Sequence, residues 1–120
     1  MSGYFVQRTP FEVPTTDNKS IKEHFGYASR KTGDYSVAHM VAPPGWSEPA
    51  QTPAFDEITL MVRGRKKVEV DGEEVILQAG ESIFVSSGTR VRYSNPFDQN
   101  AEYVAIWVPA FTLEGAGREE

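Results

Sequence analysis

Residues 57–95 read EITLMVRGRKKVEVDGEEVILQAGESIFVSSGTRVRYSN, and this stretch decides the fold of the chain. Glycines stand at positions 64, 72, 80 and 88, one in every eight residues, and no proline interrupts the stretch. The segments between the glycines are rich in Val and Ile and alternate with polar residues. Short strands with evenly spaced turn glycines are typical of an antiparallel sandwich or barrel. The sequence therefore predicts an all-β fold in which these segments pair in order as a meander.

Strands are also expected on both sides of this stretch. Residues 35–42 are predicted to form the first strand of the barrel, and residues 102–109 the last. Residues 43–53 contain four prolines and are expected to form a loop, because proline lacks the backbone donor that a sheet requires. Asp71-Gly72 suits a tight hairpin turn, since both central residues of such a turn need a positive φ.

The chain has 120 residues, which is enough for one domain with a real hydrophobic core. Residues 34–110 are expected to form a single antiparallel β-barrel. Residues 1–33 are expected to form an extended arm that packs on this barrel or on a neighbouring copy, covering unpaired backbone groups. Residues 111–120 are expected to trail off as an acidic-ended tail.

The composition excludes several classes of function. Twelve basic and 17 acidic residues give a net charge of −5, which offers no general attraction to nucleic acid or to anionic membranes. The absence of cysteine excludes disulfides, thiolate metal sites and a cysteine nucleophile. Residues 1–25 contain no apolar segment like that of a signal peptide, and no segment is apolar enough to span a membrane. A soluble, cytoplasmic protein is expected.

The spacing of the glycines resembles that of the cupins. Glu57 followed after six residues by Gly64 looks like the end of the first cupin motif. Gly80, Gly88 and Asn95 stand at the spacing of the second motif, G-x5-P-x-G-x2-H-x3-N. The resemblance implies a cupin-like jelly roll that binds a small molecule in its interior.

The residues that would bind a metal depart from the cupin pattern. Metal-binding cupins carry two histidines before the glutamate and a third in the second motif, and these positions fall on Gln51, Pro53 and Val91. Phe55-Asp56-Glu57 resembles the ethanolamine-utilisation-type cupins, which lack the histidines in the same way. The resemblance therefore implies no strong metal site, and no cofactor is expected. A weak divalent site formed by His39, Gln51 and Glu57 remains an alternative.

Glu57 is the first candidate for chemistry. Strand alternation places Glu57, Thr59 and Met61 on one face and residues 58, 60 and 62 on the other. The second face is wholly apolar, so the face with Glu57 is the mixed one that a ligand pocket needs. We expect an inward Glu57 whose pKa is raised by loss of hydration; the alternative is an idle carboxylate at the rim.

His39 and Tyr93 are the candidate acid–base partners of Glu57. Histidine titrates near neutral pH, although a histidine on an apolar strand is often a hydrogen-bonded core residue instead. The basic residues between positions 63 and 67 are expected to face solvent at the end of a hairpin. The other candidate ligand-binding residues are Gln51, Trp46, Met61, Val91, Tyr103 and Trp107.

Two classes of function follow from this site. The first is a lyase- or isomerase-type enzyme that uses Glu57 for proton transfer without a strong metal site, with a divalent-metal cupin enzyme as its variant. The second is a non-catalytic ligand-binding module with a catabolic or accessory role. The expected partners are a small polar molecule and a second copy of the chain, since the arm and the apolar strand face favour a homodimer.

Overall fold

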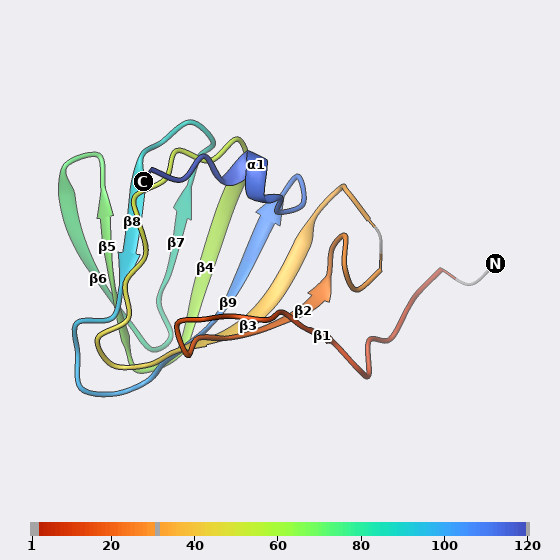
Figure 1. Cartoon of the computed structure of the whole chain (residues 1–120), viewed down its shortest axis with the longest axis horizontal. Helices are drawn as coiled ribbons and strands as arrows, with labels where there is room; N and C mark the ends of the chain where they lie inside the picture. The colour runs from red at the N-terminus through yellow and green to blue at the C-terminus, as the bar shows by residue number, and fades with distance from the viewer. Residues whose placement is uncertain (1–2, 31, 120) are drawn as a thin grey trace.

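The computed structural model describes residues 3–30 and 32–119. Residues 1–2 and 31 of the expected arm and residue 120 of the expected tail lie outside the described residues. The described chain forms nine strands and one short helix (Figure 1). In chain order they are β1 (Phe11–Glu12), β2 (Ser20–Phe25), β3 (Ser36–Ala42), β4 (Asp56–Arg63), β5 (Arg65–Val70), β6 (Glu73–Gln78), β7 (Ser82–Val85), β8 (Val91–Ser94), β9 (Ala101–Val108) and α1 (Leu113–Ala116).

The strands form two antiparallel sheets, which lie on opposite sides of the interior (Figure 1). One sheet has six strands in the order β1-β2-β3-β9-β4-β7, and the other has three in the order β6-β5-β8. The predicted hairpin joins β5 to β6, with φ values of 49° at Asp71 and 75° at Gly72. The all-β, antiparallel jelly roll expected from the sequence is confirmed.

Apart from β5 and β6, the strands of residues 57–95 do not pair in chain order, so the predicted meander is wrong. β4 pairs with β7 and β9, whereas β5 pairs with β6 and β8. Only Gly64 separates β4 from β5; it has a φ of 78°, and a Cβ there would collide with the backbone oxygen of Asn100. Gly64 is therefore the corner where the chain passes from one sheet to the other. A glycine at such a corner looks in the sequence like a glycine in a hairpin.

Segments near both ends of the described chain pack on the barrel. β2 pairs with β3 and so extends the six-stranded sheet, which places part of the expected arm on its own barrel. At the other end, Thr112 caps α1 by accepting a hydrogen bond from Gly115 N at 2.9 Å, and Glu119 N donates to Ala50 O at 2.7 Å. Through residue 119 the tail is thus folded against the proline-rich loop and does not trail off. No helix within the described ranges is long and apolar enough to cross a membrane.

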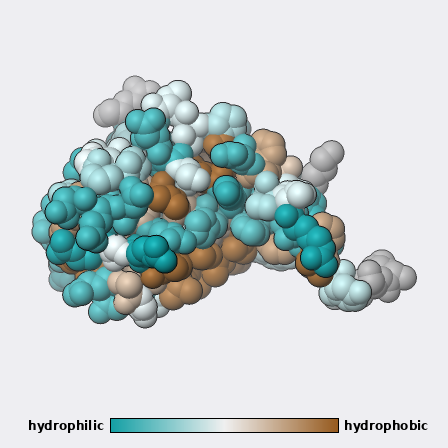
Figure 2. Space-filling model, turned by 90° about the horizontal axis from the view of Figure 1, so that it is seen from below, coloured by the Kyte–Doolittle hydropathy of each residue, from teal (hydrophilic) through white to brown (hydrophobic). Residues whose placement is uncertain are grey.

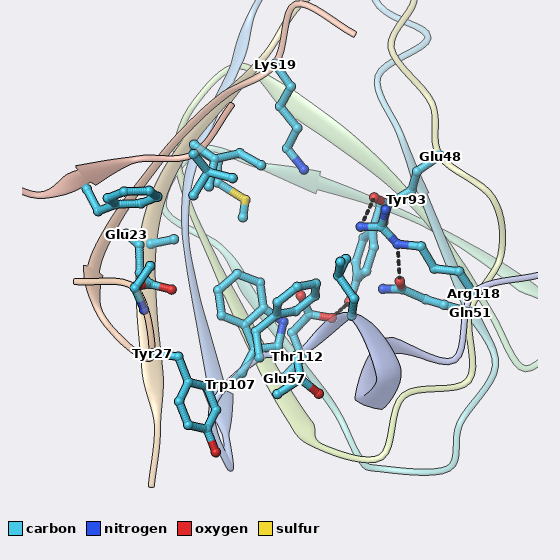
Figure 3. Close-up of a pocket in the computed structure, with 18 of the residues that line it drawn as sticks. Lys19, Glu23, Tyr27, Glu48, Gln51, Glu57, Tyr93, Trp107, Thr112 and Arg118 are labelled. Carbon is cyan, nitrogen blue, oxygen red and sulfur yellow. Dashed lines mark hydrogen bonds and ion pairs between the residues drawn. The ribbon is translucent and has the colours of Figure 1, made fainter. Parts of the chain in front are cut away.

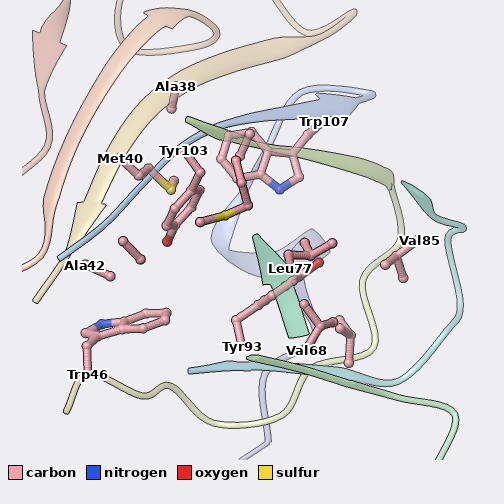
Figure 4. Close-up of a cluster of buried hydrophobic side chains, with 14 of the residues drawn as sticks. Ala38, Met40, Ala42, Trp46, Val68, Leu77, Val85, Tyr93, Tyr103 and Trp107 are labelled. Carbon is pink, nitrogen blue, oxygen red and sulfur yellow. The ribbon is translucent and has the colours of Figure 1, made fainter. Parts of the chain in front are cut away.

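Alternation along the strands creates the core. Thr59 and Met61 are buried, whereas Leu60 between them is 45% exposed, as the sequence predicts for β4. Inward side chains from both sheets meet in one cluster (Figure 4). On the surface, apolar side chains gather along the middle of the face shown in Figure 2. The expected homodimer remains a prediction.

Asn95, the last residue of the stretch that decides the fold, connects three segments. Its buried amide nitrogen donates to the backbone oxygens of Ala42, Pro43 and Gln99 at 3.1, 3.2 and 2.8 Å. Its side-chain oxygen accepts from Phe97 N at 3.1 Å. One amide therefore joins the end of β3, the proline-rich loop and the connection between β8 and β9.

We expect Asn95→Ala to lower the free energy of unfolding by about 1–3 kcal/mol, because buried carbonyl groups lose their donor. Urea denaturation followed by tryptophan fluorescence measures the change. Asn100→Ala, at an exposed position in the same connection, is the matched control and should change little. Equal unfolding free energies for the two variants would contradict this role of Asn95.

Candidate functional site

A cavity of about 440 Å³ opens into the barrel (Figure 3). This volume is within the range of pockets that bind small molecules in other proteins. The arm, the inward faces of both sheets and the C-terminal tail all contribute to its wall. The charged and aromatic residues on which the following paragraphs depend are Lys19, Glu48, Glu57, Lys66, Tyr93, Tyr103, Trp107 and Arg118.

Glu57 and Tyr93 form a hydrogen-bonded pair across the interior. Glu57 lies near the start of β4 and is 5% exposed, and Tyr93 projects from β8 of the other sheet. Tyr93 Oη donates to Glu57 Oε1 at 2.6 Å (Figure 3). Burial raises the pKa of Glu57, and the charge of Lys66 and the hydrogen bond from Tyr93 oppose that rise. Burial and the neighbouring Glu57 raise the pKa of Tyr93 well above its usual value, so its hydroxyl remains a donor.

Lys66 is the site residue that the sequence analysis missed. It was expected to face solvent at a hairpin end, but its side chain points into the barrel and is 2% exposed. Its Nζ lies 3.6 Å from the ring centroid of Tyr103 and 4.1 Å from that of Tyr93. Burial and the nearby charge of Lys19 lower the pKa of Lys66 to about 7, while Glu57 acts in the opposite direction. Alternation from the inward Val68, two residues along β5, is the signal that could have found it.

Two aromatic residues of β9 leave polar atoms without a partner. Tyr103 and Trp107 both line the cavity and are buried. Among the described residues, Tyr103 Oη and Trp107 Nε1 have no hydrogen-bond partner. Buried polar groups are normally paired, so two unpaired groups in the residues of one cavity wall are exceptions to that rule.

Lys19 reaches the cavity from the arm (Figure 3). Its Nζ lies over the ring of Trp46, 4.2 Å from the centroid, and 5.7 Å from the centroid of Tyr103. Trp46 is buried, and its Nε1 donates to Asp17 Oδ2 at 2.7 Å. Burial lowers the pKa of Lys19, and the carboxylates of Glu48 and Asp17 oppose that shift. The arm thus adds a second buried amine to the site.

Arg118 brings the tail to the same region. Its Nη2 lies 3.7 Å from Glu48 Oε2, and its Nε donates to Gln51 Oε1 at 3.4 Å (Figure 3). Gln51 is buried and lines the cavity, and its backbone exchanges hydrogen bonds of 2.9 and 2.8 Å with Val91. Because its oxygen already accepts from Arg118, Gln51 orients the guanidinium group at the mouth of the cavity.

The structure separates His39 from Glu57, which corrects the expectation that they act together. β3 directs Ala38 and Met40 inward, so His39 lies on the outer face, with its side chain 32% exposed. Its Nε2 lies 2.8 Å from Glu102 Oε2. Both faces of β3 carry apolar residues, and for this reason the alternation alone could not show which face is inside.

The other predicted ligand-binding residues divide between the cavity and the core. Trp46 lines an adjoining pocket of about 410 Å³. Met61 and Val91 lie in the hydrophobic core and do not line the cavity. The predicted residues that do line it are Gln51, Glu57, Tyr93, Tyr103 and Trp107.

The residues of the site do not fit a divalent metal. Within residues 3–30 and 32–119, no group of three His, Asp or Glu side chains lies close enough to hold one. The alternative set of His39, Gln51 and Glu57 is divided between the outside and the inside of the barrel. The amine of Lys66, when protonated, also opposes a second cation beside Glu57. Three strong donors are the usual minimum for a catalytic transition metal.

The sequence resembles known proteins over most of its length. Residues 38–108 match the family model described as "Cupin domain". Over 107 residues the chain is 42% identical to Endoribonuclease YbeY of Myxococcus xanthus. The match covers 89% of this chain and 36% of that protein, so the chain spans about a third of the length of this relative.

Several solved structures share the fold. An RmlC-like cupin from Shewanella frigidimarina has a TM-score of 0.73 at 15% identity, covering 92% of this chain and 93% of that chain. KdgF from Halomonas sp. has a TM-score of 0.72 at 16% identity, covering 91% and 94%. EutQ from Clostridium difficile has a TM-score of 0.65 at 22% identity, covering 85% and 73%. At these identities the similarity shows the fold alone.

The burial of Lys66 predicts how stability depends on pH. Its folded pKa of about 7 lies below the ordinary value of 10.5, so the unfolded chain binds this proton more tightly. The contribution of Lys66 to the unfolding free energy therefore rises with pH between these two values. Lys66→Met should remove that rise and stabilise the fold most below pH about 7, where the native barrel buries an ammonium group.

Urea denaturation of both proteins over this pH range measures the difference. Lys67→Met is the matched control, because Lys67 is the next residue of β5 and pairs with Glu74 at 3.2 Å away from the cavity. It should keep the pH dependence of the original protein. Parallel curves for Lys66→Met and the original protein would contradict the prediction.

Proposed function

The chain belongs to the cupin family, and we propose that it binds a small polar molecule inside its barrel and transfers a proton on that molecule through Glu57. The observation that carries this proposal is the 2.6 Å hydrogen bond between Tyr93 Oη and Glu57 Oε1 inside a cavity of about 440 Å³. A buried carboxyl group with a raised pKa can both accept and return a proton near neutral pH.

The two residues have different roles in such a reaction. Glu57 removes a proton from a carbon atom next to a carbonyl group of the bound molecule. Tyr93 stays protonated because its pKa is raised, so it stabilises the Glu57 carboxylate or a developing oxyanion on the ligand. Return of the proton to another atom gives an isomerisation, and loss of a leaving group gives an elimination. Lyase- or isomerase-type chemistry of small carbonyl compounds is the function that this geometry supports best.

A non-catalytic ligand-binding module is the second candidate. The observation that favours it is the partial match to a longer protein, in which the region similar to this chain makes up 36% of the length. We take such a region to be an accessory domain that binds a ligand for the longer protein. In this case Glu57 and Tyr93 bind the ligand and no proton is transferred.

Glu57→Gln separates the two candidates, since glutamine keeps the shape and removes the carboxylate. Ligands are first selected from small carbonyl compounds by the rise in melting temperature that they cause. For an enzyme, exchange of carbon-bound ligand protons in D₂O, followed by ¹H NMR, should slow by about 10²- to 10⁴-fold. For a binding module, no exchange occurs, and the affinity measured by calorimetry should fall by about 1–3 kcal/mol.

Glu102→Gln is the matched control, because Glu102 lies on the outer face of the six-stranded sheet and pairs with His39. It should leave exchange and affinity unchanged. If Glu57→Gln changes neither quantity for any ligand that stabilises the protein, the proposed role of Glu57 is wrong.

A further inference from the structure

Among the described residues, no anionic group contacts the buried amine of Lys66. Every salt bridge among the described residues involves other side chains, so no carboxylate in that part of the chain is in direct contact with Lys66 Nζ. The neighbours of the amine are the ring faces of Tyr93 and Tyr103, at 4.1 and 3.6 Å from their centroids. A lysine that served only to balance the charge of Glu57 would be expected to contact it. The position of Lys66 in the cavity wall therefore needs another explanation.

The surroundings of Lys66 are those of a nucleophilic amine. Burial and the neighbouring cation Lys19 lower the pKa of Lys66 to about 7, so the amine loses its proton much more readily than an exposed lysine does. Lysines become nucleophiles toward carbonyl groups when they are desolvated or placed near another cation, and both conditions hold here. The two tyrosine rings restrict the conformations of the Lys66 side chain. The amine therefore loses less conformational entropy when it reacts.

A second amine in the same cavity indicates the charge of the ligand. Lys19 Nζ lies 5.7 Å from the centroid of Tyr103, the ring that Lys66 also contacts. Like Lys66, it is absent from the salt bridges among the described residues. In the same wall, Tyr103 Oη and Trp107 Nε1 are buried without a hydrogen-bond partner among the described residues. An ammonium group with nearby donors is a suitable site for a carboxylate.

We propose that Lys66 forms an imine with the carbonyl carbon of a small oxo acid whose carboxylate binds to Lys19. Both amines lie within 5.7 Å of the centroid of the same Tyr103 ring, which limits the distance that the ligand spans between its carbonyl and its carboxylate and favours short oxo acids. The inference rests on the proposed binding of a small molecule in this cavity. It adds the class of that molecule and a covalent role for Lys66.

The step is balanced without any further reactant. The lone pair of Lys66 Nζ forms a bond to the carbonyl carbon, and the π electrons of the carbonyl move to its oxygen, which takes a proton from nitrogen. Glu57 then protonates the resulting hydroxyl group, which leaves as water while nitrogen and carbon form the double bond. The released water carries the remaining proton of the nitrogen to Glu57. An amine and a ketone give an imine and water, and nothing is oxidised or reduced.

Reductive trapping tests the proposal on the full chain. The protein is incubated separately with pyruvate, acetoacetate and levulinate, which place zero, one and two carbons between the two groups, and sodium borohydride is added. We expect the intact mass to increase by the mass of the acid less one oxygen atom for at least one of them. Peptide mapping should locate the adduct on Lys66. Lys66→Arg should abolish it, whereas Lys67→Arg should retain it.

The role of Lys19 is tested with a neutral ketone. Lys19→Met should lower the yield of the oxo-acid adduct at limiting concentration by about tenfold, the effect of losing one charge-assisted hydrogen bond. Butanone, which lacks the carboxylate, should react poorly with the original protein and should be insensitive to this substitution. Equal trapping of butanone and the oxo acids would overturn the assignment of an anionic ligand.

Peptide mapping of the adduct on the original protein tests the imine proposal even if a Lys66 variant fails to fold. An adduct spread over many lysines, or none on Lys66 with all three acids, would overturn the proposal. The outcome is also distinct from that of the Glu57→Gln experiment. Trapping on Lys66 in the original protein, together with unaltered proton exchange in Glu57→Gln, would support the imine and refute only the proposed removal of a carbon-bound proton by Glu57.

Discussion

Two ionisable groups of opposite charge, Glu57 and Lys66, are buried in one barrel, and the rest of the site depends on how they are held apart. Either charge alone would be costly to remove from water, and their attraction repays only part of that cost. Tyr93 serves both: its hydroxyl donates to Glu57 at 2.6 Å, and its ring lies under Lys66. The acid keeps a proton more readily and the amine loses one more readily than in water.

This arrangement requires both sheets and both ends of the chain. Glu57 comes from the six-stranded sheet, whereas Lys66 and Tyr93 come from the three-stranded sheet, so the site exists only when the two sheets face each other. The arm supplies Lys19 and the tail supplies Arg118 at the cavity. Segments that look like appendages in the sequence therefore complete the site, and they do so because β2 and α1 pack on the barrel.

The sequence predicts the fold better than the site. Turn glycines and alternating strands depend on local backbone geometry, and they correctly place Glu57 inside. Lys66 was missed because a run of basic residues normally faces water, although the alternation from Val68 points it inward. His39 was assigned to the site because both faces of β3 carry apolar residues, and only burial in the assembled barrel shows that Met40 is inside. Which face of a strand is buried is a property of the assembled sheets.

The contacts of Lys66 also suggest why the chain can lack the histidines of the metal-binding cupins that it resembles. In those proteins the histidines hold a cation beside the glutamate, whereas here a protonated Lys66 provides positive charge in the same interior as Glu57. The charge of a lysine differs from that of a metal ion because it can be lost near neutral pH and leaves a nucleophile behind. With the roles proposed above, such a barrel combines a proton donor, a proton acceptor and a nucleophilic amine. These are the groups that the chemistry of small carbonyl compounds uses.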